Sequence, residues 1–311
     1  MSRDVFPEFL SEGTPGLYPM PLRHRFQPAA PPIPRTSFVG REREVDRIEA
    51  LLSGVDASVV TLTGPGGAGK TRLAIRVISS TRLHGHFVEL ADVQQPGLVL
   101  DAIAATLGIN LAGRPALECL RNALQDGDHL LVLDNFEQVL PAASDLAALL
   151  AACPGVKLLV TSRAVLGIPG EHVVDIRPFA LPMLQGTAPE AQAMEFDVCR
   201  LFIDRARSLD PDFALTNANV GSVVGICQRL DGLPLAIELV AAWISVLSPQ
   251  ALLTQLETPL AFPGGESPGL PLRHRTLRDT IAWSYGLLNP ASQLLFRRLA
   301  VFTGGCTLDA A

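Results

Sequence analysis

A glycine-rich segment, TLTGPGGAGKTRLAI (residues 61–75), places a lysine and a threonine directly after a cluster of glycines. It fits the pattern G-x-x-x-x-G-K-[ST], in which glycines let the backbone bend around an anion so that successive N–H groups point at it. We expect Lys70 to reach the β and γ phosphates of a nucleotide, and the Thr71 hydroxyl to bind Mg²⁺. The predicted phosphate-binding residues are Gly64, Pro65, Gly66, Gly67, Ala68, Gly69, Lys70, Thr71 and Arg72.

A second motif, LLVLDNFE, ends an apolar segment with Asp134. Ligands of open α/β sheets bind beyond the carboxyl ends of the strands, so we expect this carboxylate to hold Mg²⁺. A fast ATPase usually has a further carboxylate that orients and deprotonates the attacking water. Here Asn135 is neutral and Glu137 lies two positions further on. The sequence therefore predicts slow hydrolysis.

Arg163 follows the next apolar segment, in LLVTSR (residues 158–163). A polar group at the same edge of the sheet could sense a γ phosphate, and a guanidinium supplies a cation for it. A solvated surface arginine is the alternative interpretation, because this short pattern is weakly specific. The candidate catalytic residues are Lys70, Asp134 and Arg163.

Short apolar segments alternate with helical ones in the part of the chain that carries these motifs. The predicted strands are residues 58–64, 86–90, 129–134, 156–162 and 172–176, and the predicted helices are 69–80, 97–107, 115–126 and 137–152. Strands that alternate with helices and lack polar alternation indicate a parallel sheet covered on both faces. We therefore predict the α/β fold class, with a doubly wound parallel sheet. About seventy residues separate the two motifs, which predicts an additional strand between the motif strands.

Composition divides the chain into four parts. Residues 1–35 are rich in proline and are predicted to be a linker or tail. Residues 36–180 form the predicted α/β domain, and helical patterns replace the strands over residues 181–262. A turn-rich segment begins the last part, residues 263–311, where the chain stops as another element begins. We expect a fragment of a longer protein.

The overall composition excludes several classes of protein. The formal net charge of −6 provides no excess positive field for nonspecific nucleic-acid binding, so DNA contact is expected only through a domain not present here. The five cysteines form no CxxC pair, so neither a zinc site nor a disulfide framework is predicted. No segment has the length and composition of a signal peptide or a membrane span. We expect a cytoplasmic protein.

The ordered series of motifs from TSFVGRERE to RHRTLRDTIAWSYGLL resembles the bacterial STAND ATPases, NB-ARC-like P-loop NTPases found in large transcriptional regulators. The resemblance covers about residues 36–311 and implies an AAA-like ATPase core, a helical lid and the start of a winged-helix subdomain. It also implies bound ATP or ADP with Mg²⁺. The residues it places by the adenine and ribose are Val39, Gly40, Arg41 and, from GLPL of the lid, Pro234.

This resemblance implies a signalling switch, in which ADP holds a closed state and exchange for ATP permits self-association. Two alternatives stay open. A small-molecule kinase would need an acceptor pocket and a lid with several arginines, whereas residues 180–260 are mostly apolar helix. The second alternative is an interaction scaffold whose nucleotide site is vestigial.

Overall fold

The computed structural model describes residues 31–125, 127–183, 189–256 and 290–299. The elements of its first part are α1 (Glu42–Ser53), β1 (Val59–Thr63), α2 (Lys70–Ser80), β2 (His84–Glu89), η1 (Pro96–Leu98), α3 (Val99–Thr106), α4 (Ala116–Leu124), β3 (His129–Asp134), η2 (Phe136–Gln138), η3 (Leu140–Ala142), α5 (Ala143–Ala152), β4 (Val156–Thr161) and β5 (Glu171–Asp175). Most of the predicted linker or tail, and the predicted start of a winged-helix subdomain except residues 290–299, lie outside the described residues.

The five strands form one parallel sheet in the order β2-β3-β4-β1-β5. The two motif strands, β1 and β3, are separated in the sheet by β4 and in the sequence by β2, which confirms the predicted additional strand. Parallel pairing brings the carboxyl ends of all the strands to one edge. Glu89 therefore lies beside Asp134, and Leu62 at the end of β1 beside Thr161.

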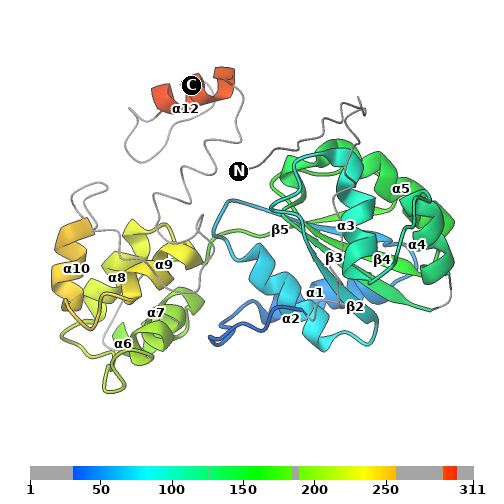
Figure 1. Cartoon of the computed structure of the whole chain (residues 1–311). Helices are drawn as coiled ribbons and strands as arrows, with labels where there is room; N and C mark the ends of the chain where they lie inside the picture. The colour runs from blue at the N-terminus through cyan, green and yellow to red at the C-terminus, as the bar shows by residue number, and fades with distance from the viewer. Residues whose placement is uncertain (1–30, 126, 184–188, 257–289, 300–311) are drawn as a thin grey trace, which may run out of the picture.

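Helices cover both faces of this sheet (Figure 1). One core cluster joins Val59, Leu131 and Leu133 of the strands to α3, α4 and α5, and the other joins Val60 and Leu62 to α1 and α2. Alternate residues of the three central strands, β1, β3 and β4, enter different apolar clusters, and these strands are mostly apolar, as expected where a sheet is buried on both sides. The predicted doubly wound α/β fold is confirmed.

The predicted helix over residues 137–152 is wrong in its first turn and a half. Two short 3₁₀ turns, η2 and η3, occupy residues 136–142, and α5 begins only at Ala143. The physical reasons are the left-handed backbone of Asn135, with φ 63°, and Pro141, which has no N–H to donate within a helix.

The second part of the chain is helical. Its elements are α6 (Pro189–Met194), α7 (Asp197–Arg207), α8 (Val220–Arg229), α9 (Pro234–Ala241), α10 (Pro249–Leu256) and α12 (Pro290–Leu299). The helices α6 to α10 contribute to a core cluster of their own, which includes Phe202, Ile226 and Ile237, and they lie beside the α/β unit in Figure 1. Within the described ranges, the structure contains no helix with the length and apolar character needed to cross a membrane.

Candidate functional site

The glycine-rich loop between β1 and α2 has the conformation that its glycines make possible. Gly64, Gly67 and Gly69 have positive φ angles of 139°, 78° and 94°. A Cβ atom on Gly64 would lie 2.2 Å from the carbonyl oxygen of Ile176, so the loop packs directly on the chain that leaves β5. The loop ends at α2, whose first residues are Lys70 and Thr71. Backbone N–H groups at a helix N-terminus favour an anion at this place.

Lys70 bends back over this loop. Its Nζ donates hydrogen bonds to the carbonyl oxygens of Gly64, at 2.8 Å, and Pro65, at 3.0 Å. Burial lowers the pKa of Lys70 to about 8; the nearby Glu137 and Asp134 carboxylates oppose this shift and Arg163 adds to it. A desolvated ammonium group gains more from a bound anion than one in water does.

Asp134 joins the loop to the neighbouring strand. Its Oδ1 accepts hydrogen bonds from the hydroxyl of Thr71, at 2.7 Å, and from that of Thr161, at 2.6 Å. Thr161 in turn accepts from the backbone N–H of Asn135, at 3.0 Å. The carboxyl ends of β3 and β4 and the start of α2 therefore converge on one buried carboxylate.

The oxygen donors of Thr71 and Asp134 fit a magnesium ion. Mg²⁺ prefers hard oxygen ligands, and in nucleotide sites it takes only one or two from the protein. No group of three or more His, Cys, Asp or Glu side chains that could hold a metal occurs among the residues that the structure describes. The chemistry of this donor pair therefore suits a metal ion shared with phosphate oxygens and water.

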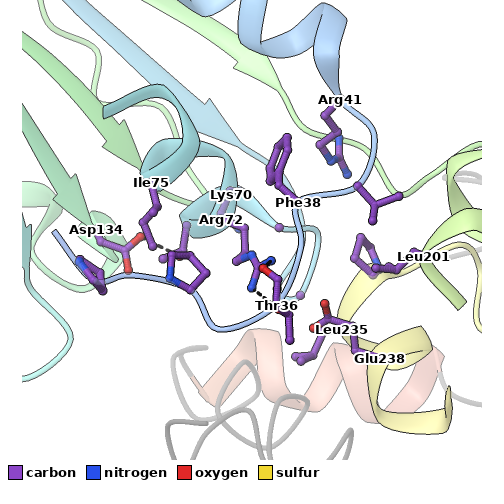
Figure 2. A pocket seen from close by; sticks show the side chains of 18 of the residues that line it. Thr36, Phe38, Arg41, Lys70, Arg72, Ile75, Asp134, Leu201, Leu235 and Glu238 are labelled. Atoms are coloured by element: carbon purple, nitrogen blue, oxygen red, sulfur yellow. Dashed lines mark hydrogen bonds between the residues drawn. The ribbon is translucent and has the colours of Figure 1, made fainter. Parts of the chain in front are cut away.

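A cavity of about 750 Å³ opens beside these groups. Its walls come from the α/β unit and from the helical unit, and the chain before α1 crosses between them (Figure 2). Its lining includes the polar residues Lys70, Asp134 and Arg163 and the apolar residues Phe179, Leu201 and Leu235. This volume lies within the range of about 300–1,000 Å³ for small-molecule sites.

The segment before α1 is tied to both walls. Arg72 donates to the carbonyl oxygens of Thr36, at 2.9 Å, and Ser37, at 2.7 Å. Arg41, with a left-handed backbone, is only 6% exposed and donates to the carbonyl oxygens of Ala68, at 2.8 Å, and Arg177, at 2.7 Å. Its guanidinium also lies 4.7 Å from the centre of the Phe179 ring.

Arg205 of α7 connects the helical unit to the segment before α1 through hydrogen bonds to Ser37. Its guanidinium donates to Glu238 of α9, at 2.7 and 2.9 Å, and to the carbonyl and hydroxyl oxygens of Ser37, both at 3.0 Å. It also pairs with the neighbouring Asp204. One buried cation thus connects two helices of the helical unit to the segment that crosses the cavity.

A main-chain contact joins the loop to the helical unit. The N–H of Leu235, in the first turn of α9, donates to the carbonyl oxygen of Gly67 at 3.2 Å. A Cβ atom on Gly67 would lie 3.0 Å from the Cβ of Leu235, so the two segments are in close contact. The GLPL segment therefore packs against the glycine-rich loop.

The structure brings most of the predicted site residues to this cavity. Those that line it are Val39, Arg41, Gly66, Gly67, Gly69, Lys70, Thr71, Arg72, Asp134, Arg163 and Pro234. Gly64, Pro65 and Ala68 form the back of the loop, where their carbonyl oxygens accept from Lys70 and Arg41. Gly40 instead lines a smaller hollow against α7, where a Cβ atom would lie 2.3 Å from Asp197.

Several lining residues were not predicted from the sequence. Phe179, Leu201, Arg205 and Glu238 lie on elements that reach the cavity only through packing of the two units, and no local pattern marks them. The sequence alone gives Glu137 no role, because it lies two positions beyond Asn135. The structure places it in the cavity lining, where its Oε1 pairs with the Nε of Arg163 at 3.2 Å.

Comparisons with known proteins agree with this geometry. The NB-ARC domain model matches residues 41–174. A putative HTH-type transcriptional regulator of Mycobacterium tuberculosis is 40% identical over 256 residues, which are 81% of this chain and 28% of that protein. The chain therefore spans little more than a quarter of the length of this relative.

Two other proteins are similar over most of their own length. An uncharacterized protein of Mycobacterium bovis is 38% identical over 283 residues, which cover 89% of this chain and 68% of that protein. The structure of a Walker-type ATPase of Pyrococcus abyssi has a similar fold, with a TM-score of 0.51, 14% identity and coverage of 84% of this chain and 76% of that one. Sequence motifs, sheet order and relatives together show that the chain belongs to the NB-ARC family of P-loop ATPases.

Proposed function

We propose that this chain is a nucleotide-controlled switch that binds ATP or ADP with Mg²⁺ and hydrolyses ATP slowly. The observation that supports it most is that the glycine-rich loop, Lys70, Thr71 and Asp134 line one cavity together with residues of the helical unit. Lys70 and the loop amides would hold the phosphates, Thr71 and Asp134 the metal, and Arg163 the γ phosphate. Bound Mg²⁺ would neutralise charge on the phosphates.

The adenine and ribose would occupy the apolar part of the cavity. Val39, Arg41 and Pro234 are the predicted contacts of the adenine and ribose, and all three line the cavity together with Phe179. A switch requires that the two nucleotides make different contacts in its two states. The hydrogen bond from Leu235 to Gly67 supports such coupling, because a loop that moves with the γ phosphate would also move the first turn of α9.

The proposed output is regulation of transcription, which the printed name of the Mycobacterium tuberculosis relative supports. Because this chain covers 28% of that protein, we assign DNA contact to a domain outside this chain. We further propose self-association in the ATP state and a cytoplasmic location. A small-molecule kinase is less well supported, since Arg205, which the helical unit contributes to the cavity lining, already pairs with Glu238.

The decisive experiment identifies the nucleotide that copurifies with the chain. The purified protein is denatured and the released nucleotide is identified by chromatography. We expect ADP from the parent chain. An empty parent with rapid phosphate release would favour a metabolic enzyme, and a parent that is empty and inert would favour a scaffold.

Lys70→Ala is expected to release no nucleotide in this assay and to bind added ADP roughly 10- to 100-fold more weakly, since a hydrogen bond to a charged group contributes about 1.5–3 kcal/mol. The chain has only one other lysine, Lys157, which donates to the carbonyl oxygens of Gly54 and Ala57 away from the cavity. Lys157→Ala is therefore the matched control. Equal ADP affinity in the two variants would contradict the role of Lys70.

The depressed pKa of Lys70 predicts a pH dependence of binding. Above its pKa of about 8, the free protein carries a neutral Lys70 that attracts phosphate less. We expect the ADP affinity, measured by calorimetry, to fall about tenfold between pH 7.5 and pH 9. Lys70→Arg should remove this dependence, because a guanidinium keeps its proton throughout this range. A parent affinity that is constant up to pH 9 would contradict the prediction.

A further inference from the structure

The chain turns sharply after Asp134. Asn135 has a left-handed backbone, with φ 63° and ψ 47°, which is uncommon for a residue other than glycine. Its N–H donates to Thr161, and the 3₁₀ turn η2 follows at once. Phe136 is fully buried in the core, so the turn is anchored beneath the sheet edge. Asparagine adopts this conformation more readily than most other residues, so the sequence supports the turn.

This turn brings Glu137 into the cavity. The Glu137 side chain is only 11% exposed, and its Oε1 lies 3.2 Å from the Nε of Arg163. The other oxygen, Oε2, is buried and has no hydrogen-bond partner within the part of the chain that the structure describes. A buried carboxylate oxygen without a partner is unfavourable unless a ligand or water donates to it. The geometry therefore leaves an acceptor oxygen beside the predicted phosphate site.

Arg163 can change partners at this place. Its side chain is 27% exposed and lines the same cavity, so it has access to a bound ligand as well as to Glu137. A γ phosphate carries more negative charge than one carboxylate and offers oxygens that suit a guanidinium. Because a neighbouring cation stabilises the ionised form of a carboxylate, a carboxylate that loses such a partner accepts a proton more readily.

We propose that Glu137 is a catalytic residue that accepts the proton of the attacking water, and that it is freed for this role when Arg163 moves to the γ phosphate. This inference rests on the proposed function. In the step, the water oxygen forms a bond to the γ phosphorus. The bond from that phosphorus to the bridging oxygen breaks, its electron pair stays on ADP, and the water proton passes to Glu137 and then to solvent.

The test is the isosteric variant Glu137→Gln in the full chain. With radiolabelled ATP under single-turnover conditions, we expect hydrolysis at least about 100-fold slower than in the parent, since a general base contributes about 10²- to 10⁴-fold. We expect ATP affinity, measured with a fluorescent ATP analogue, to be equal or several-fold higher, because Arg163 loses a competing charge. Nucleotide extracted after incubation should be ATP in the variant and ADP in the parent.

Two glutamates provide the comparison. Glu118 is exposed on α4 and does not line the cavity, so Glu118→Gln should hydrolyse ATP at the parent rate. Glu89 lines the cavity beside Asp134 and is the competing candidate for the base. ATP hydrolysis at the parent rate in Glu137→Gln would overturn the inference. So would a loss of about 100-fold in the hydrolysis rate that occurs only in Glu89→Gln. In either case nucleotide binding would still support the proposed function.

A purely positioning role of Glu137 is tested with Arg163→Ala. If Glu137 acted only by holding Arg163, adding Glu137→Gln to Arg163→Ala would not slow hydrolysis further, and that result would overturn the inference. We expect the double variant to be slower than Arg163→Ala. A parent that binds ATP without hydrolysing it would also contradict the inference, whereas a parent that binds no nucleotide would contradict the proposed function itself.

Discussion

Gly64→Ala is expected to abolish nucleotide binding and to lower the thermal stability of the chain sharply. A Cβ atom at this position would lie 2.2 Å from the backbone oxygen of Ile176, and the φ angle of 139° is one that alanine rarely adopts. Backbone strain and overpacking each cost about 1–3 kcal/mol, so the free energy of unfolding should fall by about 2–6 kcal/mol. We expect a decrease in Tm of about 10 °C, measured by circular dichroism.

The matched control separates the steric clash from backbone strain. Gly113 also has a positive φ, 79°, but a Cβ atom there would meet no atom within 4 Å. Gly113→Ala should therefore cost only about 1–2 kcal/mol and leave ADP binding unchanged. Similar losses of Tm in the two variants would show that the contact with Ile176 does not constrain the loop.

Arg205→Met should loosen the helical unit from the segment that crosses the cavity. The substitution removes the guanidinium, which is 9% exposed, and leaves the carboxylates of Glu238 and Asp204 without their cation. Removal of one partner of a buried ion pair costs about 3–5 kcal/mol. Because Glu238 is 28% exposed and water can compensate part of this loss, we expect about 2–3 kcal/mol.

The measurements are Tm and the rate of limited proteolysis, with and without ADP. We expect a fall in Tm of roughly 5–10 °C and faster cleavage in the segment before α1. Arg200→Met is the control on the same helix, because its side chain is 41% exposed and its ion pair, with Asp197, lies within α7; it should change stability by about 1 kcal/mol or less. Equal rates of cleavage in the two variants would contradict the role of Arg205 in holding the segment before α1 against the helical unit.

The sheet could be predicted from sequence because its signals are local. A parallel strand buried on both faces is a continuous apolar run, and β3 was predicted to the residue, at 129–134. The helix over residues 137–152 was misplaced at its start because a left-handed Asn135 leaves no mark in an apolar pattern. The same turn explains Glu137, which the sequence places two positions beyond Asn135 and which the 3₁₀ turn brings into the cavity lining.

The site could be predicted only where one short segment carries the chemistry. The spacing of Gly64, Lys70 and Thr71 encodes a loop on its own, whereas Arg205 and Glu238 meet Ser37 only after two units pack. Such pairs depend on contacts between residues far apart in sequence, for which a single sequence has no periodic signal. The role of each predicted residue in binding stays a prediction.

The contact between Leu235 and Gly67 is made by main-chain atoms, an N–H and a carbonyl oxygen. Side-chain replacement at either position leaves both atoms in place, with proline at 235 as the exception because it has no N–H. Substitutions can therefore change the side chains around this hydrogen bond without removing the bond, because both of its atoms belong to the backbone. Relatives that differ widely in side chains can keep the same mechanical connection between loop and helix.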